Sequence, residues 1–199
     1  HSQWITGPEA RARAHRLRVA HDAVMVGSGT AVVDNPRLSV RLPGLEGAQP
    51  LRVVVDGRLR VPLTHDLVAH ARTRPTLLIT RPDALPDRRR AYADAGVEIA
   101  EADVGADGTM AADGILRALG ERGIAHVLVE GGSVLAAGLC RADLVDEIAW
   151  FRAPRLIGGD GVPAIAGFGV AELDSTPQFT RVATEGVGAD ILETYRRAT

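Results

Sequence analysis

The 199-residue sequence contains no lysine and a single cysteine. All 23 of its lysine-or-arginine positions are therefore arginines, so an anionic ligand must be held by guanidinium groups or by backbone amides. A lone cysteine excludes an internal disulfide framework and is typical of a reducing cytosol. Cys140 ends the apolar run that begins at Leu135, so we expect a buried structural thiol rather than a nucleophile.

The sequence also lacks a long apolar segment, a signal-like beginning and a strong excess of either charge. No stretch approaches the ~20 apolar residues of a membrane span, and no charged segment followed by an apolar block opens it. A net charge of −2 provides no global basic field for nucleic acid. The histidines after His1 show no metal-ligand spacing. We therefore expect a cytoplasmic protein without nucleic-acid, membrane or metal partners.

Apolar residues make up 46% of the chain, which is enough for a substantial core in one large domain or two small ones. Their spacing predicts strands at 23–26, 51–55, 76–80, 97–100 and 125–130, and helices at 8–20, 87–95, 110–122 and after Ser133. This alternation predicts an α/β domain around a mostly parallel sheet. A strand at 145–150 follows, and the segments 179–182 and 191–196 predict a closing antiparallel hairpin.

Two helix starts carry capping signals. Thr6 and Glu9 have the spacing of a capping box, with Pro8 in the first turn. Ser133 is a suitable N-cap for the helix that follows it.

The stretch from Val129 to Ser133 joins a strand, which we expect to be buried and parallel, to a helix through two glycines. Glu130 places a carboxylate at the strand end, and Gly131 and Gly132 leave the backbone bare. The unpaired N–H groups of the following helix start would suit a pyrophosphate. The alternative is an ordinary strand-to-helix connection.

Ligands of parallel sheets bind beyond the carboxyl ends of the strands. Four predicted strand ends, at 27–30, 56–57, 80–81 and 130–132, should therefore line one crevice. Asp34 is expected there, in a loop or a short helical turn before Pro36.

Several segments together resemble the reductase domain of bifunctional riboflavin-biosynthesis deaminase-reductases. They are Ser-Gln-Trp-Ile-Thr at 2–6, Leu-Arg at 17–18, the segment 29–41 and Val-Glu-Gly-Gly at 129–132. The resemblance covers essentially the whole chain. It implies a dihydrofolate-reductase-like three-layer α/β fold, NADPH as cofactor and a homodimer. It also implies reduction of 5-amino-6-(5-phosphoribosylamino)uracil, a phosphorylated pyrimidine, to its open-chain ribityl form.

Two features of that family are not found in the sequence. The zinc-deaminase pattern of His-x-Glu with Pro-Cys-x-x-Cys is absent, and one cysteine could not supply it. Family members also have a strand ending in Asp-Gly directly before the Ser-Gln-Trp motif, where only His1 precedes it here. We therefore expect residues 1–199 to form a reductase domain without the deaminase domain and without the family's first strand.

The resemblance implies two sets of ligand contacts. The substrate contacts would be Ser2, Arg18, Leu38, Arg41 and Glu130. The cofactor contacts would be Trp4, Thr30, Asp34, Gly57, Gly132, Ser133, Val134, Leu135, Ala136, Ala137 and Gly138, where family members can have a serine at position 57. Arg81 is either a partner for the 2′-phosphate of NADPH or a simple edge-of-sheet arginine. In such folds a cis peptide bond is also expected between Gly131 and Gly132.

Hydride transfer needs no nucleophile and no metal, but it needs a group that manages protons as the sugar ring opens. We hypothesise that Asp34 manages those protons and that Glu130 hydrogen-bonds the pyrimidine. Arg18 and Arg41 would hold the phosphate, through charge-assisted hydrogen bonds worth roughly 1.5–3 kcal/mol.

Each of these side chains also has a purely structural alternative. It is a solvated helix face for Arg18, a strand-end charge for Arg41, an Asx turn for Asp34, a solvated strand terminus for Glu130 and a hydrophobic staple for Trp4. Three functions therefore stay open: the pyrimidine reductase, a reductase of the same fold acting on a substrate such as a pterin or dihydrofolate, and a nucleotide-binding domain without turnover.

Overall fold

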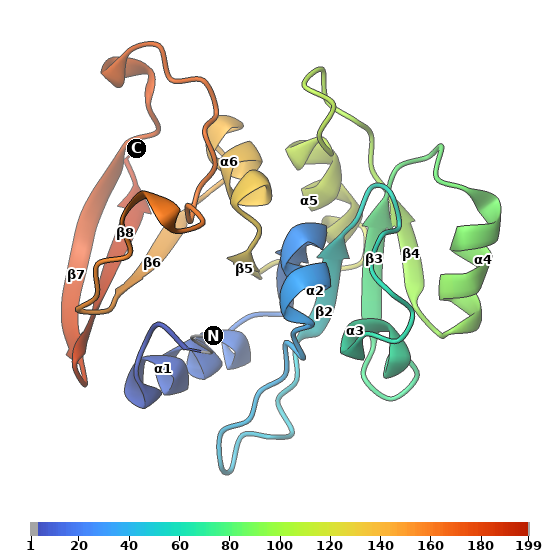
Figure 1. Ribbon diagram of the computed structural model, residues 1–199, viewed down its shortest axis with the longest axis horizontal. Coiled ribbons are helices and arrows are strands. Elements are labelled where there is room, and N and C mark those ends of the chain that lie inside the picture. The colour runs from blue at the N-terminus through green and yellow to red at the C-terminus, as the bar shows by residue number, and fades with distance from the viewer. Residues whose placement is uncertain (1–3, 199) are drawn as a thin grey trace.

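The computed structural model describes residues 4–198 and contains a parallel sheet, an antiparallel sheet and six α-helices in the described part of the chain (Figure 1). The helices are α1 (Pro8–Val19), α2 (Ser28–Asp34), α3 (Asp66–Ala69), α4 (Pro86–Asp94), α5 (Ala112–Gly120) and α6 (Ser133–Arg141). The strands are β1 (Ala23–Gly27), β2 (Leu51–Val55), β3 (Thr76–Thr80), β4 (Glu98–Glu101), β5 (Val127–Gly131), β6 (Glu147–Arg152), β7 (Phe179–Val187) and β8 (Asp190–Arg197).

The parallel sheet has the strand order β4-β3-β2-β1-β5. β1, β2 and β3 consist almost entirely of apolar, mostly branched residues and are buried nearly throughout, as expected for strands covered on both faces. On one face Ala31 of α2, Leu67 of α3 and Tyr92 of α4 join a common core cluster. On the other face Leu119 of α5 and Leu139 of α6 join a second cluster. The expected three-layer α/β fold is thereby confirmed.

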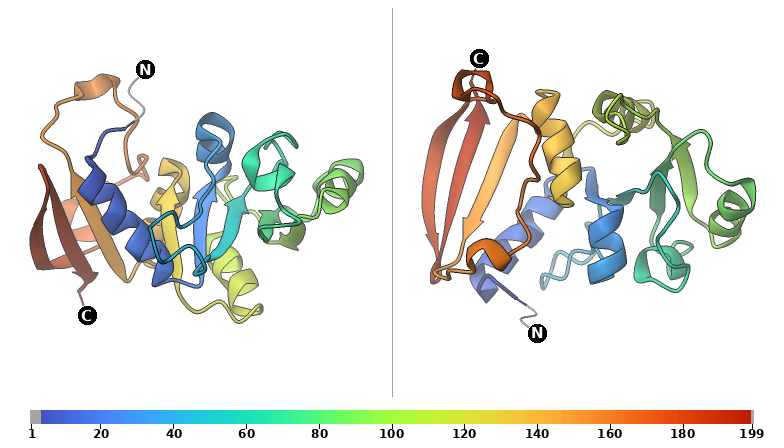
Figure 2. Two further views of the ribbon diagram at one scale, coloured as in Figure 1. Left: turned by 90° about the horizontal axis from the view of Figure 1, so that it is seen from below. Right: turned by 45° about the horizontal axis from the view of Figure 1, so that its top comes forward.

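The antiparallel sheet has the order β6-β8-β7 and contains the predicted closing hairpin. The residues flanking its turn are Val187 and Asp190, with Gly188 in the left-handed region at φ 66°. β6 pairs with β8 along its whole length, so the strand predicted at 145–150 joins this second sheet. Figure 2 shows α6 between the two sheets. Within residues 4–198 no strand pairing joins β5 to β6, which are the facing members of the two sheets.

β5 corrects one prediction. It is a parallel strand, as predicted, but it lies at the edge of its sheet and its residues are only partly buried. An edge strand has one unpaired side, which leaves its backbone open to solvent. The expectation that residues 1–199 form a reductase domain without the family's first strand stays a prediction.

Helix α1 connects the two sheets. At its N-terminal end the Gly7 N–H donates a hydrogen bond of 2.6 Å to Asp190 Oδ2 at the start of β8. Arg13 forms an ion pair of 3.4 Å with Glu185 on β7. The C-terminal end of α1 leads directly into β1, in the parallel sheet.

Both capping predictions are wrong, although Pro8 does lie in the first turn of α1. The N-cap of α1 is Gly7, which has no side chain with which to cap the helix, and the Gly7 N–H donates to the carboxylate of Asp190, a residue distant in sequence. The N-cap of α6 is Gly132, which places Ser133 at the first helical position. The peptide between Gly131 and Gly132 is trans, since no cis bond occurs among the described residues. The chain makes this bend instead through the positive φ of 100° at Gly132, a value open to glycine.

Cys140 is buried on α6, which fits the predicted structural thiol, and burial raises its pKa. No helix within residues 4–198 has both the length and the apolar character required to cross a membrane.

We expect Asp190→Ala to lower the free energy of unfolding by roughly 1–3 kcal/mol, because it leaves the Gly7 N–H at the start of α1 without its acceptor. Urea denaturation followed by circular dichroism measures this change. Asp113→Ala is the matched control, since Asp113 forms only an exposed ion pair with Arg117 and should change stability by less than about 0.5 kcal/mol. Equal effects of the two substitutions would contradict the structural role of Asp190.

Candidate active site

Arg18 and Glu130 form the centre of the candidate site. Arg18 Nε donates to Glu130 Oε1 at 2.6 Å, and Arg18 Nη2 donates to Glu130 Oε2 at 2.6 Å. This is the two-bond geometry that a planar guanidinium makes with a carboxylate. The side chains are only 14% and 19% exposed, so water screens their attraction less than it would on an open surface. Both charges are therefore paired, which disfavours the structural alternatives of a solvated helix face for Arg18 and a solvated strand end for Glu130.

The third donor of Arg18 fixes the segment that follows α2. Arg18 Nη1 donates to the backbone oxygen of Ser39 at 2.6 Å. In this segment Asn35 and Leu38 adopt the left-handed conformation, with φ of 43° and 51°. Residues without glycine's freedom adopt it only where the surroundings hold them there. The Leu38 side chain is 3% exposed and packs in the core, so a substrate would meet the backbone at this position.

Arg41 lies on the same side of the molecule as this pair. Its backbone N–H donates to His15 Nδ1 at 3.4 Å, and His15 lies one helical turn before Arg18 on α1. Partial burial, Arg18 and Arg37 lower the pKa of Arg41, against the opposing effect of Asp66. The guanidinium of Arg41 makes no hydrogen bond or ion pair with any residue from 4 to 198. A cation in this situation is available for an anionic ligand.

Asp34 and Thr30 lie on α2, which begins directly after β1. Asp34 is the last residue of this helix and is exposed, in agreement with the predicted short helical turn. No hydrogen bond or ion pair joins its carboxylate to Glu130, or to any other residue that the structure describes. Asn35, not Asp34, makes the polar contact expected of a turn, since Asn35 Oδ1 accepts the N–H of Asp66 at 2.8 Å.

The diglycine turn brings the end of β5 against β1 and α2. A Cβ at Gly131 would lie 2.9 Å from Thr30 Oγ1, and a Cβ at Gly132 would lie 3.1 Å from both Cα and N of Gly27. The packing of the protein itself therefore requires both glycines. Beyond the turn, the Ala136 N–H donates to the Gly132 oxygen in the first hydrogen bond of α6. The N–H groups of 133–135 consequently have no acceptor within their own helix.

Gly57 and Arg81 follow the neighbouring strands β2 and β3. A Cβ at Gly57 would lie 2.8 Å from Met110 Sδ and 3.1 Å from Arg81 Cγ, so a serine here requires Met110 to move. Arg81 binds Asp83 through its Nε at 2.8 Å and its Nη2 at 2.5 Å. Its guanidinium is thus already paired, which favours the alternative of an edge-of-sheet arginine.

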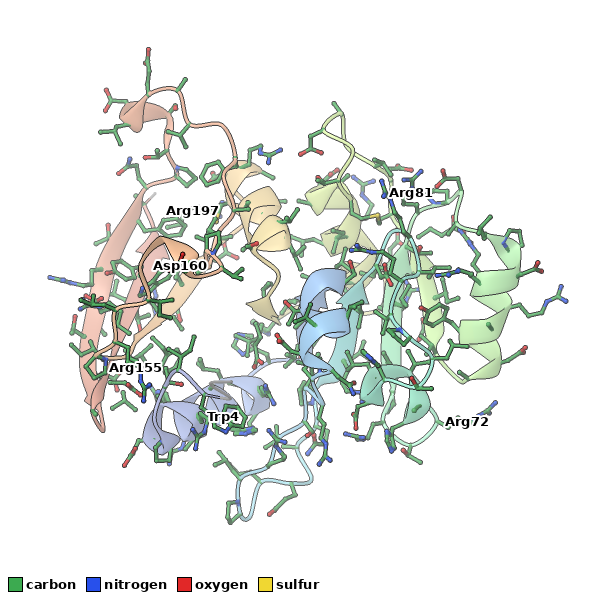
Figure 3. The ribbon with its side chains drawn as sticks, viewed as in Figure 1. Trp4, Arg72, Arg81, Arg155, Asp160 and Arg197 are labelled. Atoms are coloured by element: carbon green, nitrogen blue, oxygen red, sulfur yellow. The ribbon has the colours of Figure 1, made fainter. Side chains whose placement is uncertain are left out.

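Trp4 lies beside α1, far from Arg81 at the end of β3 (Figure 3). Its side chain is in part exposed, and the Arg11 guanidinium lies 4.7 Å from the centre of its ring. Ser2, which the resemblance places among the substrate contacts, lies outside the described residues.

Several functional candidates were missed by the sequence reasoning. His15 was given no role, although its spacing of three residues from Arg18 on a helix is a signal that the two share a face. A pocket beside Arg41 is lined by Arg37, Asp66, His70 and Arg74, among others. No local pattern connects these four, because α3 and the turn after it reach Arg37 only in the folded chain.

Among residues 4–198, no group of three or more histidine, cysteine or acidic side chains is arranged to hold a metal ion.

His15 provides a titration test of this arrangement. Burial first, then Arg18 and Arg41, lower the pKa of His15 below 6.5, and Glu130 opposes them. Because the pKa is lower in the folded protein, the unfolded chain binds more protons near pH 6. This histidine therefore reduces stability as the pH falls through 6.5 toward the folded pKa.

We expect NMR titration to give His15 a pKa below 6.5 in the wild-type protein and a higher pKa in Arg41→Gln, because that variant removes one positive neighbour. Arg117→Gln, which removes an exposed guanidinium on α5, should leave the His15 titration unchanged. A His15 pKa that does not respond to Arg41→Gln would show that the two residues are not coupled.

The chain is similar to known proteins over nearly its whole length. A family model described as the RibD C-terminal domain matches residues 1–192. The riboflavin biosynthesis protein RibD of Actinobacillus pleuropneumoniae is 35% identical over 195 residues, which cover 98% of this chain and 51% of that protein. RibD of Chlamydia trachomatis is 39% identical over 166 residues, covering 82% of this chain and 43% of that protein. The chain thus spans about half the length of the curated relatives it matches.

Solved structures are similar over nearly the whole chain. Acinetobacter baumannii RibD (form 2) has a TM-score of 0.80 and 26% identity, covering 98% of this chain and 52% of that one. A Thermotoga maritima protein has a TM-score of 0.77 and 29% identity, covering 99% and 51%. It is described as a diaminohydroxyphosphoribosylaminopyrimidine deaminase and 5-amino-6-(5-phosphoribosylamino)uracil reductase. The family match and these relatives lead to one conclusion: the chain belongs to the RibD C-terminal domain family.

Proposed function

We propose that this chain reduces 5-amino-6-(5-phosphoribosylamino)uracil to 5-amino-6-(5-phosphoribitylamino)uracil with NADPH. One observation carries the proposal: Arg18 holds the Glu130 carboxylate in a fixed position, and the unpaired guanidinium of Arg41 lies on the same side. A pyrimidine ring offers N–H donors to the carboxylate, and a phosphate offers acceptors to the guanidinium. Family membership and the described activity of the Thermotoga maritima relative support this choice of reaction.

The residues after β5 suit a dinucleotide cofactor. The N–H groups of Ser133, Val134 and Leu135 have no acceptor within α6, and they lie at the positive end of its dipole. In the proposal these groups bind the pyrophosphate, and the segment from Gly132 to Gly138, which includes the first turns of α6, contacts the cofactor together with Trp4, Thr30, Asp34 and Gly57. A bound NADPH would supply the hydride that the reaction requires.

Each side chain of the site then has a distinct role. Glu130 accepts hydrogen bonds from the pyrimidine, and Arg18 fixes the direction in which Glu130 points. Arg41 binds the substrate's phosphate. Asp34, whose carboxylate has no partner among the described residues, exchanges a proton with the sugar as its ring opens.

The proposal extends to a cytoplasmic homodimer. The dimer is supported by large exposed apolar side chains on the segment between β6 and β7, among them Leu156, Ile157, Val162 and Leu173. Where such side chains form a large contiguous patch, they mark a protein–protein interface. Light scattering of the purified protein should give twice the chain mass.

The proposed activity is tested by NADPH consumption at 340 nm. We expect turnover with 5-amino-6-(5-phosphoribosylamino)uracil and a lower kcat/KM with its dephosphorylated form, which lacks the group that Arg41 binds. Equal rates with both forms would favour a reductase of another substrate. The absence of NADPH consumption, with NADPH still bound, would favour a nucleotide-binding domain.

We expect Asp34→Asn to lower kcat by about 10²–10⁴-fold, because asparagine cannot transfer the proton. Cofactor affinity, measured by NADPH fluorescence, separates this effect from a loss of binding. Asp113→Asn on α5 is the control that keeps normal turnover. Near-normal kcat in Asp34→Asn would remove Asp34 from the catalytic role.

Glu130→Gln should act differently, on substrate binding. It removes a charged acceptor for the pyrimidine and the partner of the Arg18 fork, so kcat/KM should fall by about 10- to 100-fold. Steady-state kinetics at several substrate concentrations measures the change. A kcat/KM within twofold of the wild-type value would contradict the assignment of Glu130.

A further inference from the structure

The ion pair between Arg81 and Asp83 leaves one group of the proposed cofactor without a cation at the end of β3. NADPH differs from NADH by a phosphate on the 2′ oxygen of its adenosine ribose, which a nearby arginine can accommodate. Arg81 Nε and Nη2 donate to the two carboxylate oxygens of Asp83 at 2.8 and 2.5 Å. Because this fork is occupied and the chain has no lysine, selectivity for the 2′-phosphate has to come from another arginine.

The proposed cofactor contacts indicate where that arginine has to lie. The pyrophosphate is assigned to the start of α6, directly after β5, whereas Thr30 and Gly57 follow β1 and β2. In the order β4-β3-β2-β1-β5, these two strands lie successively further from β5. The nicotinamide has to reach the substrate at Glu130, at the end of β5. The adenosine half of the cofactor therefore extends along the ends of β1 and β2.

Arg60 connects the ends of these two strands. It belongs to the turn after β2, and its Nη2 donates at 2.6 Å to the hydroxyl of Ser28, the first residue of α2. α2 begins directly after β1 and lies against the diglycine turn, since a Cβ at Gly131 would lie 2.9 Å from Thr30 Oγ1. The guanidinium of Arg60 is thus held beside the segment to which the pyrophosphate is assigned.

The charge of Arg60 is only weakly compensated by its surroundings. Its side chain is 58% exposed, and its one ion pair within residues 4–198 is the long approach of 3.9 Å to Asp56 Oδ1. The other oxygen of Asp56 accepts the backbone N–H groups of Arg60 and Val61. In the described part of the chain, the neutral hydroxyl of Ser28 is the only group to which the guanidinium donates a hydrogen bond. A guanidinium has five N–H donors, so most of them are free for a phosphate.

The turn that carries Arg60 is fixed in a strained shape. Leu59 adopts the left-handed conformation with φ 53° and is 1% exposed in the core. Its backbone oxygen accepts a hydrogen bond from Arg88 on α4, and the Asp56 carboxylate holds the next N–H. Such conformations persist only where the surroundings impose them, and they cluster at ligand clamps. The backbone of Arg60 is therefore positioned before a ligand arrives.

We propose that Arg60, together with the hydroxyl of Ser28, binds the 2′-phosphate of the cofactor and determines its selectivity for NADPH over NADH. The inference rests on the proposed function, and it adds these two residues as specificity determinants. The fork of Arg60 matches two oxygens of a phosphate. The Ser28 hydroxyl accepts a hydrogen bond from Arg60 and can donate its own hydrogen to a third oxygen.

Two adenosine nucleotides test this site without turnover. Adenosine 2′,5′-bisphosphate carries the 2′-phosphate, and 5′-AMP lacks it. By calorimetry the wild-type protein should bind the bisphosphate about tenfold more tightly, and Arg60→Gln should bring the two affinities within about twofold of each other. Ser28→Ala should reduce the preference less, as should Arg60→Lys, which keeps the charge without the fork. Arg117→Gln, which removes an exposed arginine on α5, should keep the full preference.

Steady-state kinetics with the two cofactors gives a second readout. We expect Arg60→Gln to raise KM for NADPH by about tenfold and to leave KM for NADH within about twofold of the wild-type value. Its kcat should stay near the wild-type value, because the 2′-phosphate is remote from the reacting carbon. Arg81→Gln should leave the ratio of the two KM values unchanged, because Asp83 already holds the Arg81 fork.

The site is overturned if the wild-type protein binds the two nucleotides equally, if Arg60→Gln keeps the preference, or if Arg81→Gln abolishes it. Failure of the proposed function gives a different result. In that case the preference for the bisphosphate is present and is lost in Arg60→Gln, but the wild-type protein consumes no NADPH with 5-amino-6-(5-phosphoribosylamino)uracil.

Discussion

The hydrogen-bonded ion pair between Arg18 and Glu130 is the interaction on which the arrangement of the site depends. It joins the last turn of α1 to the end of β5, two segments 112 residues apart in the sequence. The same guanidinium holds the backbone at Ser39. Because both side chains are largely shielded from water, loss of either partner would leave a poorly solvated charge. Three segments are thus held at one place by a single side chain.

The pair is one end of the connection that α1 makes between the two sheets. α1 contacts the antiparallel sheet at its beginning, through Gly7 with Asp190, and the parallel sheet at its end, through Arg18 with Glu130. Within residues 4–198 no strand pairing connects these sheets, so α1 and α6 carry much of the connection between them. The orientation of α1 therefore affects the position of Glu130 at the open edge of β5.

The arginines of this lysine-free chain differ in how many protein groups each one binds. Arg18 is fully occupied by protein acceptors and orients a carboxylate. Arg52 is buried behind Asp66 and stabilises the packing between β2 and α3. Arg81 is paired with Asp83, whereas Arg41 has no partner among the described residues. The number of protein partners separates the structural guanidiniums from those that are open to a ligand.

The diglycine turn shows how one sequence signal can have two physical causes. The bare backbone at 131–132 was interpreted as room for a pyrophosphate. The structure shows that Gly131 fits against Thr30 and that Gly132 fits against Gly27, so the close approach of β5 to β1 already requires both. The left-handed conformation of Gly132 adds a third reason. These requirements are compatible with a cofactor at the start of α6, but they do not depend on one.

The sequence by itself determined the strands, the larger helices and their alternation, because apolar spacing reflects which faces are buried. It also determined, through the motifs of its N-terminal 41 residues and of 129–132, the family to which the chain belongs. Only the tertiary structure decided that Asp190 rather than Thr6 satisfies the start of α1, that β5 is an edge, and that Arg18 binds Glu130. It alone placed Arg37, Asp66 and Arg74 around one pocket. The physical reason is that helix and strand formation follows from neighbours along the chain, whereas the partner of a charge or a backbone N–H is chosen by segments that meet only when the chain has folded.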